Sequence, residues 1–147
     1  MITIKQNPTC FLIDDDIDDR DFLLDALAKL DSKFTFLWAK DGAEGVRMLS
    51  SGEIIPQLIL LDLNMPKMAG PECLVRLRKL PHLLATPIYI YTTAQCSELL
   101  ISNMISAGAR SVFMKPIRMN DLVRMMKNLI DQITHDKTRK LASKKVK

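Results

Sequence analysis

Short apolar runs alternate along the chain with longer segments whose apolar residues recur every three or four positions. The short runs predict buried strands at residues 9–13, 34–38, 58–62, 87–91 and 111–114. The longer segments predict amphipathic helices over residues 17–30, 42–49, 71–80, 97–107 and 120–134. Five strands alternating with five helices indicate an α/β fold, in which helices cover both faces of a doubly wound, five-stranded parallel sheet.

Charged side chains stand where three of the predicted strands end. They are Asp14, Asp15 and Asp16 after the first strand, Asp62 at the end of the third, and Lys115 after the fifth. Because ligands bind at the carboxyl ends of the strands in an open parallel sheet, we expect these groups to converge. Carboxylate oxygens suit Mg²⁺, whereas the cysteines and histidines that zinc needs are scattered. The pattern therefore predicts a pocket for Mg²⁺ and a phosphate group.

Other acidic residues near the first predicted helix are interpreted as structural. Asp16 is expected in the turn before that helix, and Asp18 and Asp19 in its first turn, where the helix dipole favours negative charge. Asp41 is predicted to be the N-cap of the second helix.

The bulk composition fits one globular domain, with 147 residues, 48% of them apolar and 26% charged. No apolar stretch approaches the roughly 20 residues of a membrane span, and the N-terminus lacks the pattern of a signal peptide. We therefore expect a cytoplasmic protein without a membrane segment. Three widely spaced cysteines are expected to be reduced thiols, mostly buried.

The formal charge of +4 is unevenly distributed along the chain. Residues 137–147 hold six of the 21 basic side chains and no acid, so residues 1–136 carry 15 basic and 17 acidic groups and a charge of −2. Segments of this composition bury little apolar surface, which predicts a disordered, basic C-terminal tail. Nonspecific attraction to nucleic acid, acidic lipid or an acidic partner is the alternative to simple solvation.

Four features at the predicted strand ends resemble the receiver domain of bacterial two-component response regulators. They are the acidic pair Asp14 and Asp15, Asp62 within the segment Leu-Asp-Leu-Asn-Met-Pro, the hydroxyl residue Thr92 after the fourth strand, and Lys115-Pro116 after the fifth. The resemblance covers about residues 8 to 135. It implies a flavodoxin-like fold, with residues 1–136 as the receiver domain and residues 137–147 as a tail.

The resemblance also implies the chemistry of the pocket. Asp62 would be the phosphoacceptor, which attacks the phosphohistidine of a sensor histidine kinase or of a histidine phosphotransfer protein. Mg²⁺ would be held by Asp14, Asp15, Asp62 and the backbone carbonyl of Asn64. Such a domain is a switch rather than an enzyme, because the only reactions it catalyses are its own phosphoryl transfer and dephosphorylation.

The remaining residues of the resemblance concern the response to phosphate. Lys115 would hold a phosphoryl oxygen, and Thr92 would donate its hydroxyl to the new phosphate and draw the loop after the fourth strand inward. The peptide bond before Pro116 is expected to be cis. No DNA-binding domain is recognised in the sequence, so we expect the output to be a change in association, either with an unidentified downstream protein or with a second copy of the chain.

One position departs from the resemblance. Many receivers carry an aromatic residue three positions before the lysine, and this chain has Val112 there. Phe113 is adjacent, but neighbouring residues of a strand point to opposite faces, so it is not expected to substitute.

Three alternative functions remain. A receiver-like adaptor would bind partners without phosphorylation. A phosphatase of the haloacid dehalogenase type needs a second aspartate two residues after the nucleophile, where this chain has Asn64. A nucleic-acid binder would rely on the basic tail, because the body is acidic and lacks stacking aromatic residues.

Overall fold

The computed structural model describes residues 7–31 and 33–145. It contains five strands, which are β1 (Thr9–Ile13), β2 (Thr35–Ala39), β3 (Leu58–Leu61), β4 (Ile88–Thr92) and β5 (Ser111–Met114). The helices are α1 (Ile17–Ala28), α2 (Gly42–Leu49), α3 (Gly70–Arg78), α4 (Glu98–Ser106) and α5 (Met119–Lys145), with a short 3₁₀ helix at Pro81–Leu83. The order of elements along the chain confirms the predicted alternation of strands and helices.

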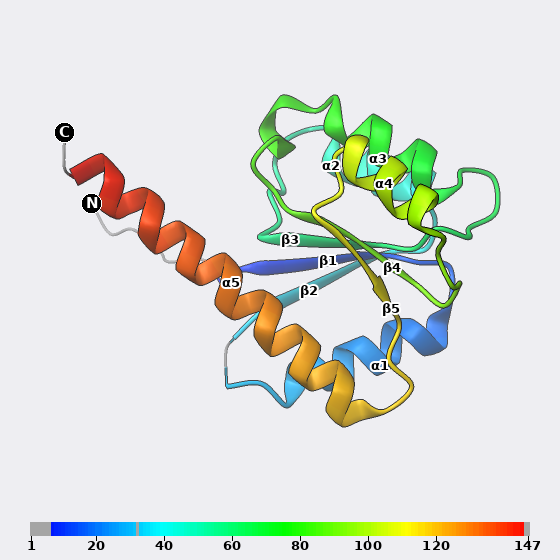
Figure 1. Cartoon of the computed structure of the whole chain (residues 1–147), viewed down its shortest axis with the longest axis horizontal. Helices are drawn as coiled ribbons and strands as arrows, with labels where there is room; N and C mark the ends of the chain where they lie inside the picture. The colour runs from blue at the N-terminus through cyan, green and yellow to red at the C-terminus, as the bar shows by residue number, and fades with distance from the viewer. Residues whose placement is uncertain (1–6, 32, 146–147) are drawn as a thin grey trace.

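The strands form one parallel sheet in the order β2-β1-β3-β4-β5. Helices α1 and α5 cover one face of the sheet, and α2, α3 and α4 cover the other (Figure 1). This three-layer arrangement confirms the predicted doubly wound α/β fold. It also brings the carboxyl ends of all five strands to one edge.

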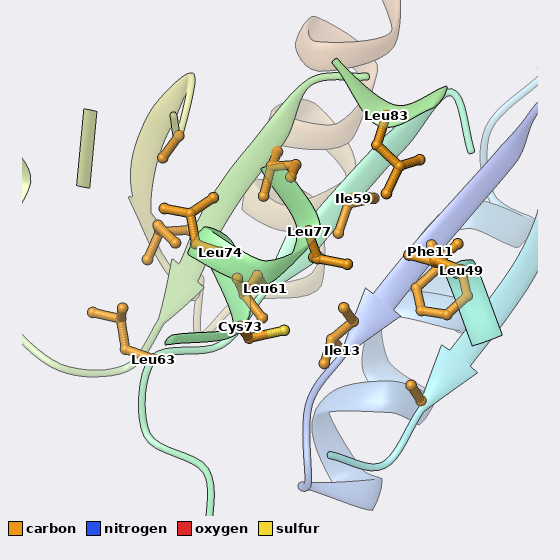
Figure 2. Packing of buried hydrophobic residues seen from close by; sticks show 14 of the residues in the cluster. Phe11, Ile13, Leu49, Ile59, Leu61, Leu63, Cys73, Leu74, Leu77 and Leu83 are labelled. Carbon is orange, nitrogen blue, oxygen red and sulfur yellow. The ribbon is translucent and has the colours of Figure 1, made fainter. Parts of the chain in front are cut away.

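The core lies on both faces of the sheet because the central strands alternate their apolar side chains between the two layers. In β3, Ile59 and Leu61 pack toward α2, α3 and α4, whereas Leu58 and Leu60 pack toward α1 and α5. Figure 2 shows the first of these layers, where Leu61 and Leu77 pack beside Ile13. A strand that is buried on both faces has an uninterrupted run of apolar residues in its sequence, and β3 has such a run.

Helix starts follow the expected capping chemistry. The Asp16 side chain accepts hydrogen bonds from the backbone N–H groups of Asp18 and Asp19, and the Asp41 side chain accepts one from Glu44. These contacts satisfy N–H groups that have no partner within their own helix. They confirm that Asp16 is a turn residue and that Asp41 is an N-cap.

The last helix is longer than the sequence analysis predicted. Residues 137–145 continue α5, so the prediction of a disordered tail is wrong for them, while 146–147 lie outside the described residues. Lysine, arginine, leucine and alanine are favourable helix formers, and no glycine or proline interrupts them. Since residues 119–136 have already nucleated the helix, each further residue adds a hydrogen bond without a new nucleation step.

The structure also bears on two smaller expectations. Cys10 and Cys73 are buried free thiols, and Cys96 is a partly buried one, as predicted. Among the described residues, none of the helices combines the length and the apolar character that crossing a bilayer requires.

Candidate functional site

Backbone hydrogen bonds that continue the sheet place the predicted site residues at one edge. The N–H of Asp62 donates to the carbonyl of Ile13 at 3.0 Å, and the N–H of Lys115 donates to the carbonyl of Thr92 at 2.8 Å. On the other side of β1, the N–H of Asp14 donates to Ala39 at 3.1 Å. Each residue therefore sits one position beyond its strand, and its backbone position is fixed by the neighbouring strand.

Three carboxylates lie together at this edge. One oxygen atom from each of Asp14, Asp15 and Asp62 falls within 4.8 Å of the others. Asp14 is fully buried and Asp62 is 6% exposed, whereas Asp15 faces solvent. Asn64, Thr93 and Lys115 line the same open cleft. A cluster of hard oxygen donors that solvent can reach from one side suits Mg²⁺.

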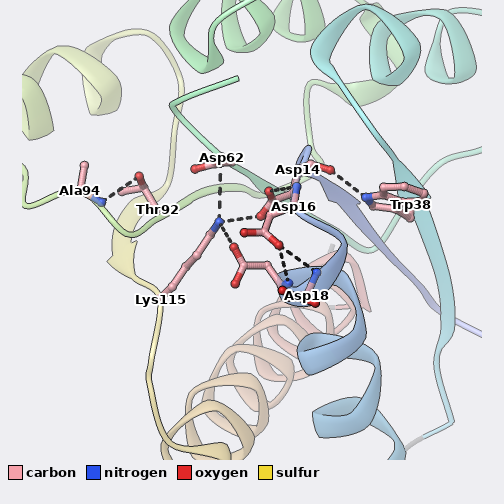
Figure 3. A network of polar contacts seen from close by, with 9 residues as sticks. Asp14, Asp16, Asp18, Trp38, Asp62, Thr92, Ala94 and Lys115 are labelled. Atoms are coloured by element: carbon pink, nitrogen blue, oxygen red, sulfur yellow. Dashed lines mark hydrogen bonds and ion pairs between the residues drawn. The ribbon is translucent and has the colours of Figure 1, made fainter. Parts of the chain in front are cut away.

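The buried ammonium of Lys115 is the positive centre of the cluster (Figure 3). Its Nζ lies 2.6 Å from a carboxylate oxygen of Asp14, 2.6 Å from one of Asp19 and 3.7 Å from one of Asp62. The sequence predicted this lysine at the pocket. Its two short contacts are with acids from β1 and α1, and its contact with Asp62 is longer.

Asp19 is the site residue that the sequence analysis misassigned. It was interpreted as a charge that only favours the helix dipole, yet its side chain hydrogen-bonds Lys115 and lines the cleft. Asp18, its neighbour, is exposed and stands one helical step away. Helical spacing gives no signal for this contact, because Asp15 precedes the N-cap Asp16 and lies outside α1.

Burial and charge shift the pKa values of the clustered groups. Burial raises the pKa of Asp14 to about 6, although its hydrogen bond with Lys115 acts in the opposite direction. Burial likewise raises the pKa of Asp62, and the charge of Lys115 offsets part of the rise. For Lys115, burial lowers the pKa, but hydrogen bonds to Asp14 and Asp19 outweigh it and the net shift is upward. The cluster therefore favours binding a further cation, which would stabilise the ionised carboxylates.

Thr92 is the fully buried last residue of β4, and its oxygen accepts a hydrogen bond from the backbone N–H of Ala94 at 3.2 Å. In this arrangement its side chain lines a neighbouring cleft with Val112 and Met114, while Thr93 lines the acidic cleft. The structure therefore brings Asp15, Asp62, Asn64 and Lys115 to the lining of one cleft, with Asp14 buried in the same cluster and Thr92 beside it.

Two expectations from the resemblance concern β5. Val112 packs with the layer of α2, α3 and α4, whereas Phe113 packs with the layer of α1 and α5, so the two side chains do point to opposite faces. The expected cis bond before Pro116 is wrong, because every peptide bond among the described residues is trans. The trans form is the intrinsically favoured one for a bond before proline, by about 0.5–1 kcal/mol.

The single tryptophan of the chain is joined to the acidic cluster. The indole Nε1 of Trp38 donates to the backbone carbonyl of Asp14 at 2.8 Å, and the Arg20 guanidinium stacks over the ring at 4.6 Å. Trp38 thus contacts the backbone of a cluster residue from β2, which no pattern in the sequence indicated.

Comparison with known proteins assigns the family. The model of the response regulator receiver domain matches residues 10–127, most of the chain. The chain therefore belongs to the response regulator receiver family, as the strand-end residues predicted.

Two curated relatives illustrate the match. The probable chemotaxis protein CheY of Rhizobium etli is 31% identical over 115 residues, which cover 78% of this chain and 86% of that protein. The probable methanogenesis regulatory protein FilR2 of Methanothrix harundinacea is 29% identical over 96 residues, which cover 63% of this chain and 61% of FilR2. The matched part is thus less than two thirds of FilR2.

A solved structure agrees with the fold. The phosphorylated cyanobacterial phytochrome response regulator RcpA superposes with a TM-score of 0.73 at 26% identity, covering 84% of this chain and 91% of that one.

Proposed function

We propose that this chain is a phosphorylation switch whose acceptor is Asp62, with a sensor histidine kinase or a histidine phosphotransfer protein as the donor. The observation that carries the proposal is the position of the Asp62 carboxylate in the open cleft, 3.7 Å from the Lys115 ammonium and within a group of three carboxylates. Membership of the receiver family supports the same reaction.

In the proposed transfer, a carboxylate oxygen of Asp62 forms a bond to phosphorus while the bond from phosphorus to the donor breaks. The donor is the imidazole nitrogen of a phosphohistidine or the carboxylate oxygen of a small acyl phosphate, and it leaves with the bonding electrons. Lys115, released from one of its two short carboxylate contacts, places its positive charge on a phosphoryl oxygen. Electrostatic stabilisation and positioning supply most of the catalysis in such transfers.

The three clustered carboxylates and the Asn64 backbone carbonyl would hold Mg²⁺. When bound there, the ion would neutralise negative charge between Asp62 and the incoming phosphoryl group. The donor set fits this ion, because it consists of oxygen atoms alone and faces solvent on one side.

Thr92 is proposed to report the phosphorylated state. Its hydroxyl accepts a hydrogen bond from Ala94 and keeps its own proton to donate, so it can turn toward a phosphoryl oxygen on Asp62. Such a turn would draw in the loop between β4 and α4 and favour one of two loop arrangements. The output would be a change in association with a downstream protein or with a second copy of the chain.

The cytoplasmic location of the protein stays a prediction.

The test is the intact mass of the protein after incubation with acetyl phosphate and Mg²⁺. We expect one phosphoryl adduct, which is lost in the presence of EDTA and in Asp62→Asn. Asp18→Asn is the matched control, since Asp18 is an exposed carboxylate that lines the same cleft outside the cluster, and it should keep the adduct. An adduct that survives in Asp62→Asn would contradict the assignment, and no adduct in the wild type would favour a phosphorylation-independent adaptor.

A further inference from the structure

A second cleft lies at the opposite edge of the sheet from the acidic cluster. Its floor is formed by the segments that lead into β3 and β4, which contribute Pro56 and Pro87. Its wall is the C-terminal part of α5, including Ile133, Lys137 and Lys140. Figure 1 shows that the C-terminal part of α5 runs past this edge of the sheet.

The cleft combines an apolar floor with a cationic rim. Ile55, which is 54% exposed, and Ala85 add apolar surface to the two prolines. Arg110, Lys137 and Lys140 supply three positive charges, against the one carboxylate of Asp136. That carboxylate is already engaged by Arg110 at 3.3 Å, so the rim as a whole is positive.

Two lysines of the rim, Lys137 and Lys140, carry charges that no described carboxylate neutralises. Within the described part of the chain, no ion pair involves Lys137 or Lys140. Lys137 instead contacts the side-chain oxygen of Gln57, a neutral group. The two residues are three apart in the helix and so lie on the same face, toward the cleft.

We propose that this cleft binds a small organic anion, namely a carboxylate with an apolar chain or ring. The apolar part would lie on Ile55, Pro56 and Pro87, and the carboxylate would lie against Lys137 and Lys140. Such a ligand satisfies both features of the cleft, because the apolar floor favours the chain and the two cations neutralise the head group. This ligand site is separate from the acidic cluster and does not depend on phosphorylation.

Octanoate is the first probe, used with the full-length, isotopically labelled protein and followed by backbone amide shifts. We expect saturable shifts confined to residues 55–57, 85–87, 110 and 133–140. Octylamine, which has the same chain and the opposite charge, should give none of them. Lys140→Glu should weaken octanoate binding by roughly threefold or more, because it reverses one of the rim charges.

Arg139→Glu is the matched control, because it makes the same charge change one residue away on an exposed position that does not line the cleft. Equal weakening by Arg139→Glu and Lys140→Glu would overturn the proposal in favour of diffuse attraction to the basic helix. Shifts at other residues, no saturable shifts at millimolar octanoate, or binding only to anionic lipid vesicles would also overturn it. Circular dichroism of both variants establishes that they remain folded.

Discussion

Asp14 is the residue whose replacement most directly tests the electrostatics of the acidic cluster. Asn in its place keeps the shape of the side chain and removes the charge. Burial raises the pKa of Asp14 from its ordinary value of 3.8 to about 6, so the folded protein holds a carboxylate that resists ionisation. We therefore expect Asp14→Asn to be more stable than the wild type at pH 7 in the absence of metal.

The magnitude follows from linkage between protonation and folding. Because the pKa of Asp14 is higher in the folded protein than in the unfolded chain, the group lowers stability only when it ionises. Below about pH 3.8 the carboxyl is protonated in both the folded and the unfolded protein, and its stabilising contribution is fully present. It is lost as the pH rises to about 6. Since each pKa unit corresponds to about 1.4 kcal/mol, the loss at pH 7 is about 3 kcal/mol. Asn does not ionise, so the variant should avoid most of this loss.

Urea unfolding in EDTA between pH 4.5 and 7.5 measures the effect. The stability advantage of Asp14→Asn over the wild type should grow with pH to about 1–3 kcal/mol and level off above pH 6 to 7. Asp18→Asn, an exposed neighbour, should stay within about 0.5 kcal/mol of the wild type at every pH. A variant that is less stable than the wild type at pH 7, or an advantage independent of pH, would refute the reasoning.

Three further predictions concern the contacts around the cleft and the core. Mg²⁺ should change the fluorescence of Trp38, because its indole donates to the backbone carbonyl of Asp14. In Asp14→Asn, a higher Mg²⁺ concentration should be needed to reach half of this change. Gly70→Ala should destabilise the protein by about 1–3 kcal/mol in urea unfolding, because the new methyl carbon would lie 2.4 Å from the backbone oxygen of Asp62. Arg78→Lys should lower the free energy of unfolding by about 1–3 kcal/mol. The guanidinium donates hydrogen bonds to three backbone carbonyls, and a lysine ammonium cannot reach all three at once.

Matched controls separate these effects from general ones. Arg76→Lys on the same helix changes an exposed pair with Glu72 and should alter stability by less than about 0.5 kcal/mol. Gly52→Ala replaces a glycine whose φ of +79° is strained for other residues, but its new methyl group would meet only a side chain. It should therefore destabilise the protein without altering phosphorylation, whereas Gly70→Ala should slow the reaction at Asp62. Equal phosphorylation rates in the two variants would contradict this account.

The sequence predicted the fold because its signals were local and strong. The four residues of β3 are apolar and buried on both faces, and the turn and cap residues Asp16 and Asp41 make the bonds that their types favour. The C-terminal segment was mispredicted for a physical reason. Composition measures how little apolar surface a segment can bury, but residues 137–145 need no core of their own, because they extend a helix that Leu122 and Met126 already anchor.

The sequence predicted which residues meet at the candidate site, but it did not predict which carboxylates contact Lys115. Strand ends in a parallel sheet converge wherever the strands are found, so Asp14, Asp62 and Lys115 could be placed at one edge from the pattern alone. The partners of a long, flexible lysine depend on which carboxylates face it at close range, and that depends on the angle at which α1 leaves the sheet. Asp19, near the start of α1, reaches Lys115 at 2.6 Å. If Asp62 is phosphorylated as proposed, the phosphoryl group would compete with Asp14 and Asp19 for the Lys115 ammonium. Phosphorylation would then be sensed at the start of α1 as well as at Thr92.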